Sequence, residues 1–242
     1  YEALYEPLVR IGLVMGRWGS DSEFGLARDT LQSLAQRPEP NGLVAWLQMM
    51  TYPAALFFTA YAIGAVKSGR LEMLHRWLTI PIVRDRRQEE DVAYSMLLGE
   101  HWEGSDQNLW NTLDKSRRKR TPFNDHMALL FQAWRGSEFF DDADVEVTFE
   151  WLEILVAIVM SCRSTNKERL EEILQGKDGQ RNFLWTLSGR ITWNCENQER
   201  LLRRMTTDPT ATALLAAGFG HDREMLDLLD QNFRRVMDRA RW

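Results

Sequence analysis

Three glutamates form the group of side chains best placed for acid–base or metal chemistry. Glu146, Glu150 and Glu153 recur at spacings of four and three residues, so a helix would carry them on one face. Carboxylates at this spacing can share a cation or raise each other's pKa. Glu150 and Glu153 also fit the solvent-exposed stripe of an otherwise buried helix. Because no histidine lies at ligand spacing, we expect no metal site and no catalytic role here.

The second candidate is the densest basic run of the chain, which covers residues 115–120. Side chains of this type bind phosphate groups, and the ones that would do so are Arg117, Arg118, Lys119 and Arg120. Cations near a helix end also complement the helix dipole and commonly form a solvated face. The chain has a net charge of −5, whereas a nucleic-acid-binding domain usually carries an excess of positive charge. We therefore favour the solvated face and keep nucleic-acid binding as an alternative.

The remaining reactive residues form no recognisable motif. The four histidines are scattered along the chain, no serine lies in a G-x-S-x-G context, and no phosphate-binding loop is present. Cys162 and Cys195 are far apart and lack a C-x-x-C spacing, which argues against a disulfide framework or a thiolate zinc site and fits the cytoplasm. We expect no cofactor. The longest apolar run, near 54–66, is too short to cross a membrane.

Helical periodicity dominates the chain, and strand-like alternation is nearly absent. The sequence predicts an all-α fold, an irregular array of helical hairpins around a central buried helix, without the period of a regular solenoid. The predicted helices cover residues 2–17, 21–36, 42–50, 53–67, 70–79, 88–98, 107–120, 122–135, 142–163, 166–175, 181–190, 194–205, 210–218 and 222–240.

Local signals mark several helix ends. Ser20–Glu23 and Thr165–Glu168 have the spacing of capping boxes, in which a hydroxyl and a carboxylate satisfy backbone donors. A proline in the first helical position marks two further starts, and glycine suits a left-handed helix end. The expected proline starts are Thr121-Pro122 and Asp208-Pro209, and the expected glycine ends are Gly69, Gly176 and Gly218.

Three helices carry the strongest packing signals. The small residues of 53–67 permit close approach of a second helix. The segment Val145–Met160 is apolar on nearly every face, so we expect it at the centre of the fold. The last helix should pack by one stripe, formed by Leu226, Leu229, Phe233, Val236 and Ala240.

We interpret residues 1–242 as a single helical domain cut from a longer protein, because the chain begins at Tyr1 without an initiator Met. If two subdomains are present, the hinge between them should lie near 80–106, where a charged, proline-containing loop precedes a glycine-rich polar one.

The stretches 1–10, 37–46, 52–56 and 68–71 resemble the helical C-terminal regions of large bacterial multidomain proteins that carry an effector module, such as a sirtuin-like domain, at the N-terminus. The similarity is clearest over residues 1–80 and returns around Trp151–Met160. It implies a role in antiviral defence, in which the helical region senses a trigger or mediates assembly while another domain performs the chemistry. It transfers no functional residue to this chain.

We therefore expect a non-catalytic interaction or sensor domain, whose partners are other domains of the parent protein or a protein trigger. The oligomeric state is left open. Two alternatives remain: a helical enzyme with its site on the 146–153 face, and a nucleic-acid-binding domain acting through the 115–120 run.

Overall fold

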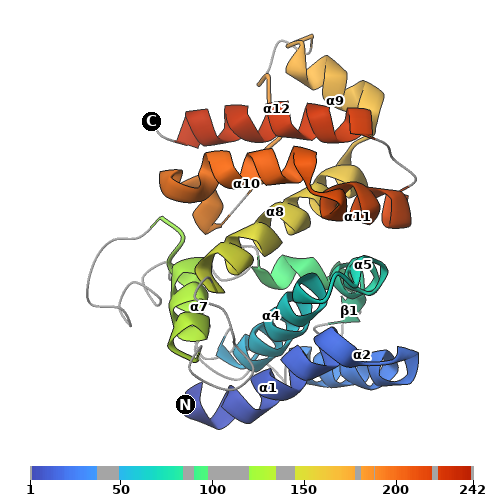
Figure 1. Cartoon of the computed structure of the whole chain (residues 1–242), viewed down its shortest axis with the longest axis vertical. Coiled ribbons are helices and arrows are strands. Elements are labelled where there is room, and N and C mark those ends of the chain that lie inside the picture. The colour runs from blue at the N-terminus through green and yellow to red at the C-terminus, as the bar shows by residue number, and fades with distance from the viewer. Residues whose placement is uncertain are drawn as a thin grey trace. The chain divides into compact units, whose positions relative to one another are not determined.

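The computed structural model describes residues 2–36, 49–83, 90–97, 120–134, 145–177, 181–187, 189–219 and 223–240. Helices make up most of these residues, which confirms the predicted all-α class (Figure 1). The chain divides into two compact units, Tyr1–Thr148 and Phe149–Trp242. This division falls within a helix and not in the 80–106 segment, most of which lies outside the described residues.

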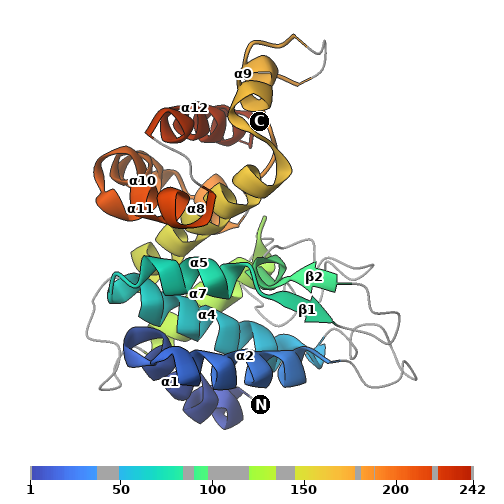
Figure 2. The same cartoon turned by 90° about the vertical axis from the view of Figure 1, so that its right-hand side faces the viewer.

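The first unit holds five helices of the described chain and one short hairpin. The helices are α1 (Glu2–Trp18), α2 (Asp21–Ala35), α4 (Tyr52–Lys67), α5 (Leu71–Leu78) and α7 (Pro122–Ala133). The hairpin pairs β1 (Pro81–Val83) with β2 (Glu90–Val92) in antiparallel register, and the 3-10 helix η1 (Ala93–Leu97) follows it (Figure 2).

The helix predicted over 88–98 is wrong, because the described residues of this segment, 90–97, form β2 and η1 instead. Val92 lies opposite Pro81 in the hairpin. The side chain of Asp91 accepts hydrogen bonds from the Val92 amide at 2.7 Å and from the Ser95 hydroxyl at 2.9 Å. Such local side-chain bonds offer the backbone an alternative to helix, and periodicity alone does not reveal them.

Helices α1 and α4 cross with their backbones in close contact. A Cβ added at Gly16 would collide with the carbonyl oxygen of Tyr61, and one at Gly64 would collide with that of Leu13. Both positions therefore need glycine, because any side chain there would collide with the backbone of the other helix. The close approach predicted for the small residues of α4 is confirmed, and α1 is the helix that makes it.

We expect Gly16→Ala to lower the free energy of unfolding by roughly 1–3 kcal/mol, because the new methyl group meets backbone and the two helices must separate. Gly25→Ala in α2 is the matched control, since a Cβ there meets nothing within 4 Å. That change should stabilise the protein by about 0.5–1 kcal/mol. Urea unfolding of both variants measures the difference, and equal effects of the same sign would contradict the close crossing.

An aromatic cluster fills the space between α2, α4 and α5. Trp77 is fully buried, donates its indole N–H to the carbonyl oxygen of Phe58 at 3.0 Å, and stacks on Tyr61 with ring centroids 3.9 Å apart. Phe24 of α2 meets both rings edge to face. The turn that returns α5 against α4 has Gly69 at φ +66°, as the sequence predicts.

The second unit begins at Phe149 within α8 (Val145–Ser164). It continues through α9 (Lys167–Leu174), the 3-10 helix η4 (Arg190–Thr192), α10 (Cys195–Thr207), α11 (Pro209–Phe219) and α12 (Arg223–Ala240). Every residue of α8 from Phe149 to Val159 is buried, in agreement with its apolar sequence. The apolar stripe predicted for the last helix is buried in α12, which confirms that prediction.

The helix predicted over 181–190 is also wrong. Residues 181–187 are non-helical, and η4 begins only at Arg190. The buried side chain of Asn232 accepts from the Leu184 amide at 2.7 Å and donates to the Leu184 carbonyl at 2.9 Å. Arg235 donates to the carbonyl of Asn182 at 2.8 Å. Side chains of α12 thus take the place of helical hydrogen bonds, and they are distant in sequence.

Most predicted helix ends agree with the structure. Glu23 accepts from the Ser20 amide at 2.6 Å in a capping box, and helices begin at Pro122 and Pro209. Gly176 lies just past α9 at φ +69°. Two predicted helix ends differ from the structure, and two predicted helices lie mostly outside the described residues. Asn166 caps α9 in place of Thr165, Gly218 lies inside α11, and nearly all of the predicted helices 42–50 and 107–120 lie outside the described residues.

Candidate functional site

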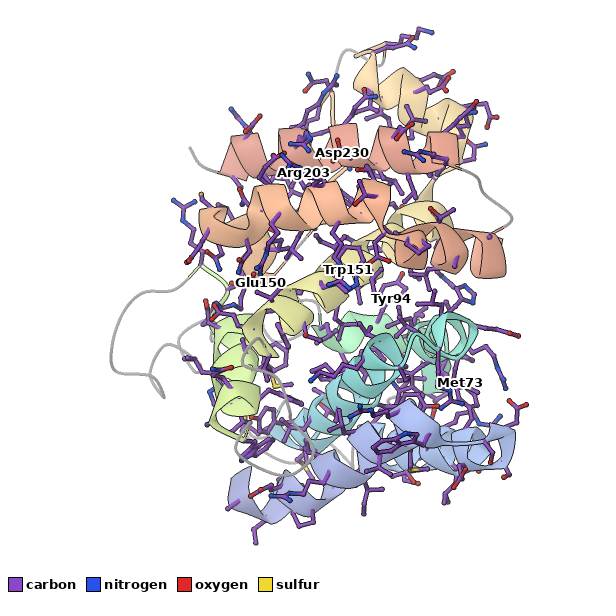
Figure 3. All side chains as sticks on the ribbon, in the orientation of Figure 1. Met73, Tyr94, Glu150, Trp151, Arg203 and Asp230 are labelled. Carbon is purple, nitrogen blue, oxygen red and sulfur yellow. The ribbon has the colours of Figure 1, made fainter. Side chains whose placement is uncertain are left out.

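Glu150 is a buried carboxylate on α8, with no solvent exposure (Figure 3). Its Oε1 accepts from the Asn194 side-chain amide at 2.6 Å, and its Oε2 accepts from that of Asn197 at 2.7 Å. The Arg190 guanidinium lies 3.5 Å from Oε1 and is itself largely buried. Both carboxylate oxygens are therefore engaged by donors of the same unit.

Glu153 lies one turn later on α8 and is 4% exposed. Its two oxygens accept from consecutive backbone amides, Arg190 N–H at 3.0 Å and Ile191 N–H at 2.9 Å. These amides open the 3-10 helix η4, whose first donors have no partner within the helix itself. Glu153 therefore caps η4 from a distant helix, in the manner of an N-cap carboxylate.

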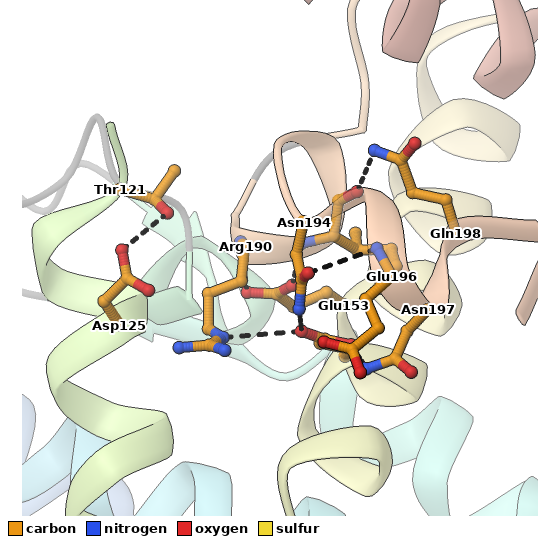
Figure 4. A network of polar contacts seen from close by, with 10 residues as sticks. Thr121, Asp125, Glu153, Arg190, Asn194, Glu196, Asn197 and Gln198 are labelled. Atoms are coloured by element: carbon orange, nitrogen blue, oxygen red, sulfur yellow. Dashed lines mark hydrogen bonds and ion pairs between the residues drawn. The ribbon is translucent and has the colours of Figure 1, made fainter. Parts of the chain in front are cut away.

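Further hydrogen bonds hold the residues that follow η4, up to Gln198 (Figure 4). The Asn194 side chain accepts from the Glu196 amide at 3.3 Å and so caps α10 while it also donates to Glu150. Gln198 donates to the carbonyls of Ile191 and Thr192 at 2.8 and 3.1 Å. The network joins residues 190–198 to α8, which is a structural task.

Burial is the main influence on the ionisation of Glu153. It raises the pKa of this carboxyl to about 8 from its ordinary value of 4.5, and the nearby Glu150 adds to the increase. The two backbone amides and the Arg190 charge act in the opposite direction but do not outweigh burial. Burial therefore shifts the balance of Glu153 toward its protonated form.

The expectation that Glu150 and Glu153 form a wet stripe is wrong, because both side chains are buried. Glu146, the third member of the predicted face, is partly exposed. Within the described residues, no group of three or more His, Cys, Asp or Glu is arranged to hold a metal ion. A substrate would have to displace the amides that already bind Glu150 and Glu153.

The raised pKa of Glu153 predicts a pH-dependent stability. In the unfolded chain this carboxyl ionises near 4.5, whereas in the folded chain it keeps its proton up to about 8. The stability that comes from the bound proton is complete below pH 4.5 and is lost as the pH rises through 8, by on the order of a few kcal/mol. We expect Glu153→Gln to show less of this loss when melting temperatures are compared from pH 5 to 9. Parallel curves for variant and parent would show that Glu153 is ionised throughout.

The basic run lies almost wholly outside the described residues. Arg117, Arg118 and Lys119 belong to the part of the chain that is left out, and Arg120 is exposed just before α7. The expected solvated face, and the alternative of phosphate binding by these four residues, both stay untested.

The other reactive side chains have ordinary environments. His126 is within 2.9 Å of the Tyr52 hydroxyl, and the two cysteines of the chain are not paired. Burial raises the pKa of the Cys162 thiol to about 12, which removes its nucleophilic character at neutral pH. None of the described helices has the length and apolar composition that spanning a membrane requires.

Helix α1 presents a second candidate site of a different kind. Its Leu4, Ile11 and Trp18 are 77%, 54% and 61% exposed, although such side chains are normally buried. They recur every seven residues, so they share one face of the helix. Pro7 is exposed on the same face. This surface, which we call the α1 outer face, lies opposite the one that Val9 and Leu13 bury.

Sequence reasoning singled out Glu150 and Glu153 but missed their burial, their partners and the α1 outer face. The partners Arg190, Asn194 and Asn197 lie some forty residues away and carry no motif. The α1 outer face does have a signal, the seven-residue repeat of Leu4, Ile11 and Trp18. It was hidden because the other face of α1 is equally apolar.

Comparisons with known proteins add no relative to this picture, since no protein-family model, curated protein or solved structure matches the chain.

Proposed function

We propose that this chain is a non-catalytic interaction domain that binds a protein partner through the α1 outer face. The carrying observation is the exposure of Leu4, Ile11 and Trp18 on one helix face. Apolar side chains gathered on an exposed surface are typical of protein–protein contact sites.

The buried glutamates support the non-catalytic part of this proposal. Glu150 and Glu153 are consumed by hydrogen bonds that hold the second unit together, so the residues best suited to acid–base work are already in structural use. A catalytic carboxylate must reach its substrate within hydrogen-bonding distance. The proposal of a helical enzyme with its site on the 146–153 face is thereby weakened.

For the biological setting of the interaction domain, we keep the proposal that the sequence resemblance implies: a sensor or assembly domain of a multidomain bacterial defence protein. The resemblance alone supports this part of the proposal. The cytoplasm fits it as a compartment, because the two cysteines are distant in sequence and unpaired.

Photo-cross-linking inside the host cell tests the interaction directly. A photoreactive amino acid replaces Leu4 on the α1 outer face, and in a control protein it replaces Glu168, an exposed polar position on α9. We expect a discrete protein adduct from position 4 that position 168 does not give. The absence of any adduct specific to position 4 would contradict the proposed function.

A further inference from the structure

The apolar character of the α1 outer face extends well beyond its three most exposed residues. Leu8, Val14 and Met15 are half-buried and flank the line of Leu4, Ile11 and Trp18. At about 100° per residue, all of them fall within one continuous arc of the helix surface. The spacing of four and three residues within this arc is the pattern of a helix that packs against another helix.

Three charged residues of α1 lie together on one side of this arc. Glu6, Arg10 and Arg17 occupy one flank, while Leu8 and Met15 make the other flank apolar. Arg10 is paired with Glu6 at 2.5 Å within the helix. The Arg17 guanidinium lies 4.7 Å from the centre of the Trp18 ring, so it reaches the edge of the α1 outer face.

We propose that the occupant of the α1 outer face is a second copy of this chain, packed antiparallel about a two-fold axis at Ile11. This inference rests on the proposed function and names its partner. An axis at Ile11 places Leu4 level with Trp18 of the second copy and Ile11 level with Ile11. Each of the three exposed side chains then packs against an exposed apolar side chain of the other copy.

The one-sided charge distribution selects the antiparallel orientation. A perpendicular two-fold axis brings charged flank to charged flank and apolar flank to apolar flank. Leu8 then lies within one residue of the level of the second copy's Met15, and Glu6 within one residue of Arg17, while the two Arg10 side chains, each paired with its own Glu6, lie within two residues of each other's level. A parallel pair would instead set the charged flank of each helix against Leu8 and Met15 of the other. Apolar residues at matched levels on the same flank favour this orientation, because it keeps the charged side chains away from Leu8 and Met15.

The contact is one pair of helices, which places it at the small end of specific interfaces. We therefore expect an equilibrium between monomer and dimer in the micromolar range. Sedimentation equilibrium of the full chain measures it, and Ile11→Glu, which sets two carboxylates against each other at the axis, should leave only monomer.

The matched control is Leu129→Glu on α7. Leu129 is 51% exposed, close to the 54% of Ile11, but it lies on another helix. This variant should dimerise like the parent. Circular dichroism shows that both variants keep their helical structure.

Cysteine pairs test the orientation, in a protein whose own cysteines are replaced by Cys162→Ala and Cys195→Ser. A short thiol cross-linker should join two copies of Ile11→Cys. It should join Leu4→Cys to Trp18→Cys when the two variants are mixed, and it should join neither to itself. Efficient linkage of Leu4→Cys to itself would overturn the antiparallel arrangement.

The two proposals fail differently. A chain that stays monomeric throughout the micromolar range overturns the second copy as occupant. If position 4 then still yields a cellular adduct with a different protein, the proposed function stands and only the identity of the partner changes.

Discussion

Replacement of Glu150 by alanine should lower the free energy of unfolding by about 3–5 kcal/mol. The change removes the carboxylate that lies 3.5 Å from the buried Arg190 guanidinium and that accepts from the side-chain amides of Asn194 and Asn197. Breaking a buried charged network in this way costs far more than the network contributes relative to an apolar core. Urea unfolding followed by circular dichroism measures the loss.

Glu199 supplies the control within the same unit. Its carboxylate pairs with Arg234 at 2.7 Å, but its side chain is 64% exposed. We expect Glu199→Ala to cost less than about 1 kcal/mol, because water replaces the lost partner. If Glu150→Ala proved as mild as Glu199→Ala, and instead abolished turnover of some substrate, the network would be catalytic and our interpretation wrong.

Val156→Asp should be comparably severe, with a loss of several kcal/mol. Val156 is 3% exposed in the buried stretch of α8. A carboxylate there must either stay charged without a partner or take up a proton, and both outcomes are unfavourable. The full chain should lose its cooperative melting transition or melt at a far lower temperature.

Helix α9 provides a graded comparison for that substitution. Asn166 caps α9, its side chain accepting from the Arg169 amide at 2.9 Å, so Asn166→Ala should cost about 1 kcal/mol. Glu168 is exposed and is not part of a capping box, so Glu168→Ala should stay within about 0.5 kcal/mol. A melting temperature for Val156→Asp close to those of these variants would mean that α8 is not buried in solution.

Sequence reasoning succeeded where the decisive interactions are local or periodic. The apolar periodicity of 223–240, the prolines at 122 and 209 and the glycine at 69 act within a few residues, and each agrees with the structure. It failed at 88–98 and 181–190, where hydrogen bonds override helical periodicity. In the second case the partner is Asn232, which nothing in the local sequence indicates.

The candidate sites show the same limit. The spacing of Glu150 and Glu153 correctly placed them on one helix. Whether their side chains are exposed or buried depends on the donors in residues 190–197, which the spacing does not reveal. A carboxylate in a buried helix needs several donors, and the sequence offers no rule for which distant segment supplies them. The α1 outer face is different, because its seven-residue repeat is visible once both faces of that helix are considered.

Oxidation of tryptophan by hydroxyl radicals, in cells that contain the protein at its natural level, tests most directly whether the α1 outer face is a contact site. Trp18 is 61% exposed in the chain and Trp185 is 40% exposed, so the isolated and dilute protein should oxidise faster at Trp18. In the cell a bound partner should cover Trp18 and reverse this order, while Trp185 serves as the internal reference. If Trp18 remains the faster of the two in the cell, the α1 outer face is uncovered and our account of the protein as an interaction domain acting through that face is contradicted.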